Sequence, residues 1–227
     1  MVNISIIIVT YNSGRFIGQC LDSLSSQTDK DFELVIIDNG SSDDTREIIK
    51  RKMPAECLIT NKANAGFSKG VNQGIGRSQG KNILLINSDV VLQDDFISRL
   101  KHALARLPFD VGMVSPKLLM PDKRRIDSTG LVLSVMRRFY DRGRGSVDSG
   151  RFDEKRDIFG PCAAAALYTR QMLEDIKTDT EYFDEDFFVL LEDFDVAWRA
   201  RNRGWKAVFL PELVCFHREV FLARDRR

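Results

Sequence analysis

The stretch ISIIIVTYN, residues 4–12, sets the architecture of the chain. Its apolar part is an almost continuous β-branched run, which is typical of a strand buried on both faces. The polar residues Thr10, Tyr11 and Asn12 end that run. Apolar residues then recur at helical spacing over residues 16–24, so the chain opens with a buried strand followed by an amphipathic helix.

The same order of strand and helix repeats through the first half of the chain. Residues 32–37 and 82–86 predict two more buried strands, and residues 57–59 predict a short one. Asp43 is placed to cap the helix after the second strand, and a glycine-punctuated helix around Val71 precedes the fourth. This alternation predicts an α/β fold with a mostly parallel, Rossmann-like central sheet flanked by helices.

The second half is less regular and predicts a smaller mixed region. Residues 111–120 and 126–135 indicate two strands or a hairpin. Residues 137–156 are rich in glycine and arginine, and this composition predicts a long mobile loop. A helix over residues 192–203 is expected to end at Gly204, before a further strand.

Neither an internal repeat nor a linker divides the 227 residues. We therefore expect one domain over residues 1–227, with two halves at 1–110 and 111–227. Hydrophobic residues make up 43% of the chain and charged residues 30%, which is enough for a core without disulfides. The formal net charge of +1 gives no reason to expect nucleic acid as a partner.

Several features bear on the cellular compartment. The start of the chain lacks the basic segment and cleavage site of a signal peptide, and no apolar run approaches the roughly 18–20 residues of a membrane span. The four cysteines form no C-x-x-C pair, which favours free thiols in a reducing compartment. The sequence predicts a cytoplasmic protein and leaves open a contact with the inner face of the cell membrane.

Polar clusters follow three of the predicted strands, where ligands bind in open parallel sheets. They are Thr10-Tyr11-Asn12, Asp38-Asn39-Gly40 and Asn87-Ser88-Asp89. Any one of them could be an ordinary turn, because these residue types dominate turns. Three clusters at three successive strand ends favour a binding site.

The glycine pattern excludes two common nucleotide sites. No G-x-G-x-x-G follows the first strand and no P-loop is present. A bound diphosphate would therefore be neutralised in another way, and a divalent cation held by a carboxylate is the obvious candidate. Asp89 follows a buried strand after a short Asn-Ser step, where it could reach a metal or simply cap a turn.

Two features late in the chain could complete a site. Glu192-Asp193-Phe194-Asp195 opens the predicted helix, where acids are also favoured by the helix dipole. The aromatic and acidic segment 182–188 just before it could raise the pKa of a carboxylate towards a useful general-base value. His217 ends a short apolar strand, and it is either a structural residue or a metal ligand.

These residues resemble glycosyltransferase family 2, whose members are inverting enzymes with the GT-A nucleotide-diphospho-sugar transferase fold. The pattern is most similar to the rhamnosyltransferase-like branch that builds bacterial cell-surface glycans. The resemblance runs from Ile4 to about His217. Its pieces are residues 8–12, 38–43, 64–67 with Asn72 and Gly74, 84–89, Gly160 with Ala163 and Ala164, 192–195 with Arg199, and Gly204-Trp205 through Pro211 to His217.

The resemblance implies a role for each matching position. Asp193 matches the catalytic base, and Asp89 and His217 match the ligands of a divalent cation, Mg²⁺ or Mn²⁺. Residues on the acceptor and sugar side would be Glu192 and Trp205. Nucleotide-sugar contacts would come from Thr10, Tyr11, Asn12, Asp38, Asn64, Gly66, Asn87 and Ser88, with Asp38 accepting a hydrogen bond from the base imide.

The implied activity is metal-dependent, inverting transfer of a sugar from a nucleoside-diphosphate sugar to a hydroxyl of a glycan or lipid-linked acceptor. The donor would be UDP- or dTDP-linked, with dTDP-rhamnose one candidate. One position departs from the family: Asn87 stands where many members have Asp, which makes Asp89 carry more of the metal site. The alternatives are a sugar-1-phosphate nucleotidyltransferase and a non-catalytic sugar-nucleotide-binding protein.

Overall fold

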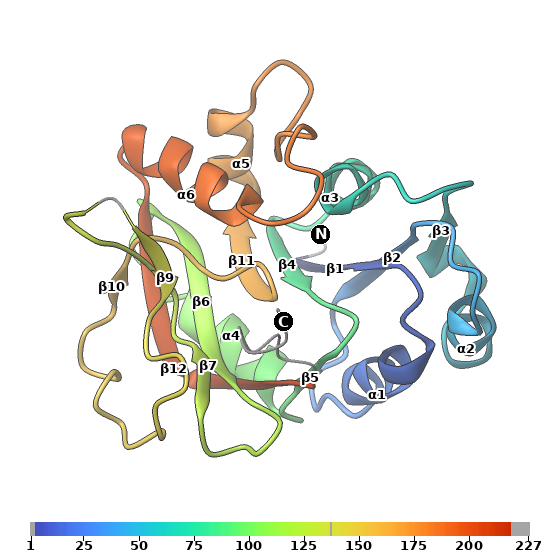
Figure 1. The fold of residues 1–227 in the computed structure, drawn as a ribbon, viewed down its shortest axis with the longest axis horizontal. Helices are drawn as coiled ribbons and strands as arrows, with labels where there is room; N and C mark the ends of the chain where they lie inside the picture. Colours follow the sequence, from blue (N-terminus) through green and yellow to red (C-terminus); the bar gives the residue numbers. More distant parts are fainter. Residues whose placement is uncertain (1–2, 137, 219–227) are drawn as a thin grey trace, which may run out of the picture.

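The computed structural model describes residues 3–136 and 138–218, which form an α/β fold around one large curled sheet (Figure 1). The first half supplies four mutually parallel strands in the spatial order β4-β1-β2-β3. Their bounds are β1 Ile4–Thr10, β2 Glu33–Asp38, β3 Leu58–Thr60 and β4 Asn82–Ile86. The sequence-based prediction of these four strands is confirmed.

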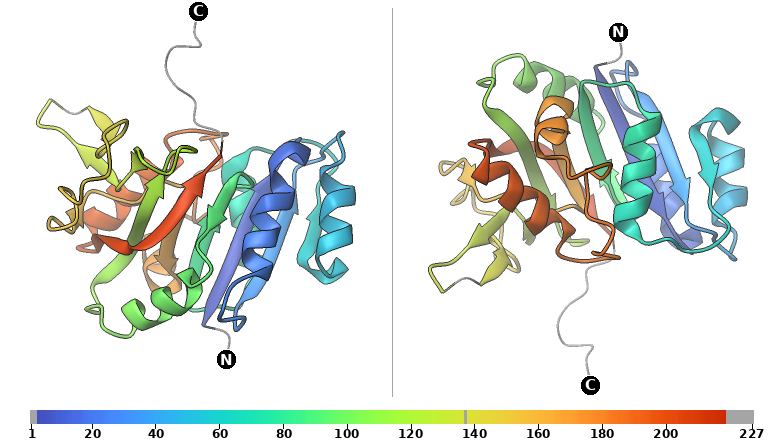
Figure 2. Two further views of the ribbon diagram at one scale, coloured as in Figure 1. Left: turned by 90° about the horizontal axis from the view of Figure 1, so that it is seen from below. Right: turned by 90° about the horizontal axis from the view of Figure 1, so that it is seen from above.

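Helices cover both faces of this sheet (Figure 2). Ile4, Ile6 and Ile8 of β1 are buried in one core with α1 (Gly14–Ser25), α2 (Thr45–Lys52) and α4 (Phe96–Leu104). Ile7 is buried in the other core with α3 (Phe67–Arg77), α5 (Arg170–Ile176) and α6 (Glu192–Asn202). Alternate residues of a strand point to opposite faces, so the continuous apolar run of β1 serves two cores at once.

The second half extends the same sheet with mixed strand directions. Strand β11 (Ala165–Thr169) lies antiparallel between β4 and β6 (Val111–Leu119), and β12 (Lys206–His217) runs parallel to β6. Short strands β5 (Val90–Leu92) and β10 (Asp157–Ile158) pair with β12, and β7 (Ile126–Ser128) pairs with β6. A separate hairpin joins β8 (Leu131–Leu133) to β9 (Phe139–Asp141), and a short 3-10 helix spans Ala55–Cys57.

Two boundaries differ from the sequence-based expectation. The strand expected after Gly204 and the short apolar strand expected before His217 are one strand, β12. Its register against β6 shifts between Leu210 and Val214. The cap of α2 is Asp44 rather than Asp43. Asp43 instead accepts hydrogen bonds from Gly14 N (2.9 Å) and Thr45 N (3.1 Å), and so ties the starts of α1 and α2 together.

The expected loop over residues 137–156 is present over most of the described segment, where turns predominate and most residues are exposed or half-buried. Two features of the segment were not expected, and Arg137 lies outside the described residues. The segment contains β9, and the Arg142 side chain is buried. Arg142 Nε donates to Thr129 Oγ1 (2.9 Å), and its guanidinium lies 4.9 Å from the centroid of the Phe209 ring. The composition of the segment did not predict this burial. An arginine can be buried when hydrogen-bond acceptors and an aromatic face surround its guanidinium.

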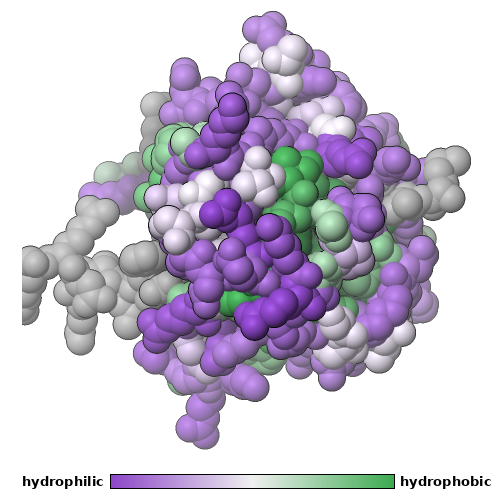
Figure 3. Space-filling model, turned by 90° about the vertical axis from the view of Figure 1, so that its right-hand side faces the viewer, coloured by the Kyte–Doolittle hydropathy of each residue, from purple (hydrophilic) through white to green (hydrophobic). Residues whose placement is uncertain are grey.

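The edge of the sheet formed by β3, together with α2, faces solvent. Figure 3 shows this side covered mainly by hydrophilic side chains.

All four cysteines are free thiols, as expected. Among the described residues, no helix is long and apolar enough to cross a membrane.

The packing of α3 against β1 leads to a stability prediction. A Cβ added at Gly74 would lie 2.5 Å from Ile7 Cγ2, whereas one at Gly76 would meet nothing within 4 Å. Gly74→Ala should therefore lower the free energy of unfolding by about 1–3 kcal/mol through overpacking, despite the better helix propensity of alanine. Gly76→Ala is the matched control and should raise it by up to about 1 kcal/mol. Urea unfolding of both variants checks this, and equal effects would contradict the close contact of α3 with β1.

Candidate functional site

The carboxyl ends of β1, β2 and β4 meet at one edge of the sheet, as the sequence predicted. Thr10 is the register partner of Asp38, and Asn39 N donates to Thr10 O (2.8 Å). Ser88 Oγ donates to Ser13 Oγ (2.9 Å), which joins the end of β4 to the end of β1. These contacts therefore link the three polar clusters of the sequence at one edge of the sheet.

The β1 end presents three different environments. Thr10 is buried, and its Oγ1 has no hydrogen-bond partner among the described residues, while Tyr11 is half exposed. Asn12 has a left-handed φ of 50°, and its Oδ1 accepts a hydrogen bond from Ser42 N (2.8 Å). Asn12 thus ties the loop after β1 to the loop after β2, and Tyr11 is the side chain left open to a ligand.

Asp38 is fully buried at the end of β2. Ser41 donates to both of its carboxylate oxygens, from Oγ to Oδ1 and from N to Oδ2. Arg46 Nε lies 4.0 Å from Oδ2 and supplies a positive charge. Each carboxylate oxygen can accept a second hydrogen bond, so the predicted contact with a base imide stays a prediction.

Asn64 and Gly66 lie where α3 begins. Asn64 Oδ1 accepts a hydrogen bond from Gly66 N (3.0 Å), and Gly66 adopts a φ of +89°. A Cβ at Gly66 would lie 2.7 Å from the Phe188 ring and 2.8 Å from Phe188 O. Only glycine fits there, because both the backbone conformation and the close approach of Phe188 exclude a side chain.

The aromatic and acidic segment before α6 is held against the start of α3. Phe67 N donates to Phe188 O (2.6 Å), and Asn72 Oδ1 accepts from the backbone N of both Tyr182 (3.2 Å) and Phe183 (2.9 Å). The end of the segment leaves an exposed apolar run over residues 188–191. This run leads directly into Glu192 and Asp193.

His217 lies between two carboxylates. Its Nε2 is 3.2 Å from Asp89 Oδ2, and its Nδ1 is 2.8 Å from Asp127 Oδ2. Burial alone would lower the pKa of His217, but the hydrogen bonds to Asp127 and Asp89 outweigh it and raise that pKa to about 9. The structure thus brings together Asp89 and His217, which are far apart in the sequence.

The donor set of Asp89 and His217 fits a divalent cation. A carboxylate oxygen and an imidazole nitrogen together suit Mg²⁺ or Mn²⁺, and Asp89 Oδ2 and His217 Nε2 lie 3.2 Å apart. Among the described residues, no group of three or more His, Cys, Asp or Glu side chains could hold an ion by itself. A cation here would need further oxygen ligands, as Mg²⁺ does when it is bound with substrate phosphates and water.

Asp193 and Glu192 are both buried at the start of α6. Asp193 Oδ2 accepts from Ala163 N (3.1 Å) and Oδ1 from Phe194 N (2.9 Å). Burial raises the pKa of Asp193 to about 6, although these hydrogen bonds lower it. Burial and the neighbouring Asp193 charge raise the pKa of Glu192 to about 7, and Glu192 Oε2 has no hydrogen-bond partner among the described residues.

A short run of backbone contacts connects this pair to the end of β4. Asn87 N donates to Ala164 O (2.9 Å), and the adjacent Ala163 N donates to Asp193. Two neighbouring residues, Ala164 and Ala163, therefore link Asn87 to Asp193 at the start of α6. Asn87 and Asp193 are more than one hundred residues apart in the chain.

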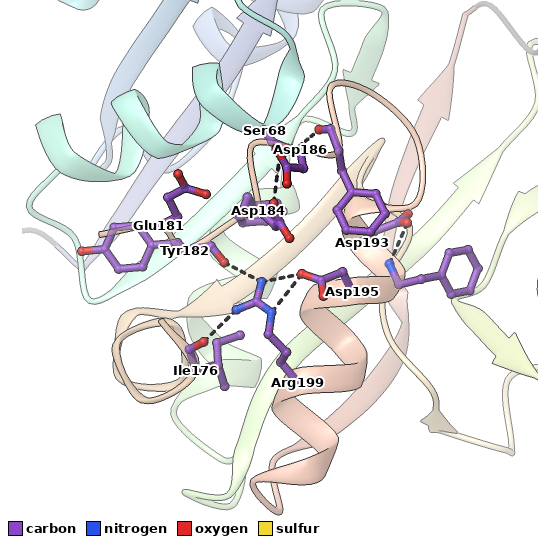
Figure 4. A network of polar contacts seen from close by, with 12 residues as sticks. Ser68, Ile176, Glu181, Tyr182, Asp184, Asp186, Asp193, Asp195 and Arg199 are labelled. Carbon is purple, nitrogen blue, oxygen red and sulfur yellow. Dashed lines mark hydrogen bonds and ion pairs between the residues drawn. The ribbon is translucent and has the colours of Figure 1, made fainter. Parts of the chain in front are cut away.

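Arg199 fixes the position of α6. Its guanidinium donates to Asp195 Oδ2 on the same helix, to Ile176 O (2.7 Å) and to Tyr182 O (2.8 Å), as Figure 4 shows. Arg199 and Asp195 form an ion pair one helical turn apart. The contacts clamp α6 onto the segment that follows α5, and so hold Asp193 against Ala163.

One predicted site residue lies elsewhere. Trp205 follows the carboxyl end of α6, and its Nε1 donates to Asp175 Oδ2 (2.8 Å) at the end of α5. A helix of 11 residues is about 16 Å long, so Trp205 is separated from Asp193 by the length of α6. The structure does not bring Trp205 into the group formed by Asp89, His217, Glu192 and Asp193.

One site residue was missed from the sequence. Asp127 is buried against His217 in a stretch expected to be a strand or hairpin. The signal for it was present, since an aspartate inside an apolar strand pattern is unusual unless it is paired.

Comparison with known proteins supports the same assignment. The family model described as Glycosyl transferase family 2 matches residues 5–177. The chain is 26% identical over 233 residues to an N-acetylglucosaminyl-diphospho-decaprenol L-rhamnosyltransferase of Mycobacterium tuberculosis, with 93% of this chain and 75% of that protein covered. It is 30% identical over 112 residues to the glycosyltransferase GlyA of Streptococcus pneumoniae, covering 48% of this chain but only 16% of GlyA.

Among solved structures, the chain is similar to the mannosyltransferase PcManGT from Pyrobaculum calidifontis in complex with GDP-Man and Mn²⁺. The TM-score is 0.69 at 20% sequence identity, and the match covers 98% of this chain and 58% of that one. This likeness confirms the expected GT-A fold. With a family model that matches most of its length, the chain belongs to glycosyltransferase family 2.

Proposed function

We propose that this chain transfers a sugar, with inversion, from a nucleoside-diphosphate sugar to a hydroxyl group of an acceptor. The observation that carries the proposal is the link from Asp193, a buried carboxylate with a raised pKa, through Ala163 and Ala164 to the end of β4, which leads into Asp89 and its partner His217. Family membership supports the class of reaction. The geometry supports the roles of the individual residues.

Asp193 is the general base in this proposal. Its carboxylate takes the proton from the acceptor hydroxyl while that oxygen bonds to the anomeric carbon, and the bond from this carbon to the diphosphate oxygen breaks. The pKa of about 6 makes Asp193 a stronger base than an ordinary aspartate while leaving it ionised at neutral pH. The two backbone N–H groups that bind it fix its direction before the substrates arrive.

Asp89 and His217 would hold Mg²⁺ or Mn²⁺, because a set of one carboxylate and one imidazole suits either ion. A cation bound there would supply a Lewis acid to the departing diphosphate. Tyr11 and Asp38 lie at the adjoining strand ends, and Asn64 and Gly66 lie where α3 begins. All four are proposed to contact the nucleoside.

The donor and the acceptor are proposed as classes of compound. One relative is named for L-rhamnosyl transfer to a diphospho-decaprenol sugar, and the similar solved structure contains GDP-Man and Mn²⁺. For this chain we propose a UDP- or dTDP-linked donor, with dTDP-rhamnose as one candidate, and a glycan or lipid-linked acceptor. The apolar run at residues 188–191, beside the proposed base, offers a surface for an acceptor with an apolar part.

Ligand-dependent stabilisation tests the proposal directly. UDP, dTDP and GDP are each added with and without Mn²⁺, and the melting temperature is measured. A ligand at about one hundred times its Kd should stabilise the fold by about 2.7 kcal/mol, or roughly 5–10 °C for a chain of this size. At least one nucleotide should act this way, and more strongly with Mn²⁺. No shift with any of the three would overturn the proposed function.

A further inference from the structure

We propose that Asp127 is a positioning residue for the metal site, and that its carboxylate holds the His217 ring so that Nε2 faces the cation. The inference rests on the proposed function and names a residue that the family resemblance did not supply. Asp127 would not touch the ion or the substrate. It would act through His217.

The contact geometry supports this role. Asp127 Oδ2 is 2.8 Å from His217 Nδ1, and His217 Nε2 is 3.2 Å from Asp89 Oδ2. A hydrogen bond at one imidazole nitrogen decides which tautomer is present, and therefore which nitrogen keeps a free lone pair. Nε2 faces Asp89, where the cation is proposed to bind. With a cation there, the proton held on Nδ1 by Asp127 would leave Nε2 to give up its own proton and turn its lone pair to the ion.

The backbone at Asp127 is shaped for this contact. On the β6–β7 ladder, Leu118 pairs with Ser128 while Leu119 pairs with Ile126, so Asp127 is the extra residue of a β-bulge. A bulge turns one side chain out of the regular alternation of a strand. Strand β12 pairs with β6 on its other edge, where Phe216 is the partner of Leu119. The bulge therefore lies across β6 from the end of β12, beside His217.

The burial of Asp127 also calls for a reason. Its side chain is only 4% exposed, and a buried carboxylate is costly unless it is paired. Arg144 Nη2 lies 3.6 Å from Asp127 Oδ1 and also 3.1 Å, through Nη1, from Asp141 Oδ2. Arg144 thus balances part of the negative charge while leaving Oδ2 of Asp127 to His217. A metal-bound histidine usually donates its second N–H to a carboxylate in this manner.

The first test measures affinity for Mn²⁺ in the presence of UDP, dTDP or GDP, whichever stabilises the wild type, by the EPR signal of free Mn²⁺. Asp127→Ala should weaken Mn²⁺ binding by about 10- to 100-fold, the usual effect of losing such a carboxylate. Asp127→Asn should lie between Asp127→Ala and the wild type, because its carbonyl can still accept from Nδ1. Asp141→Asn changes a neighbouring half-buried carboxylate that pairs with Arg144, and should stay within about twofold of the wild type.

A second measurement separates positioning from simple stabilisation of the fold. The chain has two histidines, His102 exposed on α4 and His217, so ¹⁵N-histidine labelling gives two ring systems to assign. With Mg²⁺ and the nucleotide bound, His217 should carry its proton on Nδ1. A proton on Nε2, or Mn²⁺ affinity of Asp127→Ala within about twofold of the wild type, would overturn the inference. Failure of the wild type itself to bind Mn²⁺ with any of the nucleotides would overturn the proposed function and this inference with it.

Discussion

Replacing Asp193 with asparagine is expected to lower the rate of sugar transfer by about 10²- to 10⁴-fold, the usual contribution of a general base. The asparagine side chain has nearly the same size but cannot accept the proton of the acceptor hydroxyl. Affinity for the nucleoside diphosphate should stay within about threefold of the wild type, because Asp193 is proposed to act on the acceptor. Single-turnover transfer and calorimetric titration of the nucleotide measure the two quantities separately.

The pH profile gives this variant a sharper signature. The pKa of Asp193 is raised to about 6, so its carboxylate is ionised above that pH and protonated below it. Wild-type kcat/KM should therefore fall about tenfold per pH unit below pH 6 and level off above it. The residual activity of Asp193→Asn should lack this step.

A matched control lies on the segment before α6. Asp186 is exposed seven residues before Asp193, and Asp186→Asn makes the same chemical change without touching the buried pair. Its transfer rate should stay within about twofold of the wild type. Full activity in Asp193→Asn would remove this residue from the role of base, whatever the pH profile shows.

The strands and the outline of the site could be predicted because the signals are local. A β-branched run such as residues 4–9 can hardly be anything except a buried strand, and the polar residues after it fall at the ligand edge of any parallel sheet. Asp38 and Asp89 were found in this way. Their meeting at one edge then follows from the parallel order of β1, β2 and β4.

The roles of Asp193 and His217 came from the family resemblance, because the positions of these two residues depend on long-range strand pairing. His217 reaches Asp89 only because β12 pairs with β5, with His217 opposite Val90. Asp193 reaches the end of β4 through Ala163, which precedes β11, and no local pattern shows that β11 lies between β4 and β6.

Neither the local patterns nor the family resemblance assigned the contacts of Asp127 and Arg142. The side chain of Asp127 turns towards His217 because of a bulge, and a bulge depends on the register between two strands rather than on composition. Arg142 is buried because Thr129 and the Phe209 ring lie beside it. A charged, glycine-rich stretch looks solvated until its partners are known.

Asp89→Ala is expected to abolish the effect of Mn²⁺ on nucleotide binding and to lower sugar transfer by roughly 10³-fold, since a cation at a departing diphosphate contributes several kcal/mol. The substitution removes the only carboxylate of the Asn87-Ser88-Asp89 step. His217 keeps its hydrogen bond to Asp127, so the fold should remain intact. The measurement is the Kd of the nucleoside diphosphate with and without Mn²⁺, beside the transfer rate.

Three comparisons decide whether Asp89 alone carries the site. Asn87→Ala and Ser88→Ala should weaken nucleotide binding by less and should preserve its dependence on Mn²⁺, because neither residue offers a charge to the ion. Asp22→Ala removes an exposed carboxylate on α1 that forms an ion pair with Lys52, and should change neither quantity. If Mn²⁺ strengthened nucleotide binding equally in Asp89→Ala and in the wild type, the ion would have to bind elsewhere, and the pairing of Asp89 with His217 would then be a structural contact.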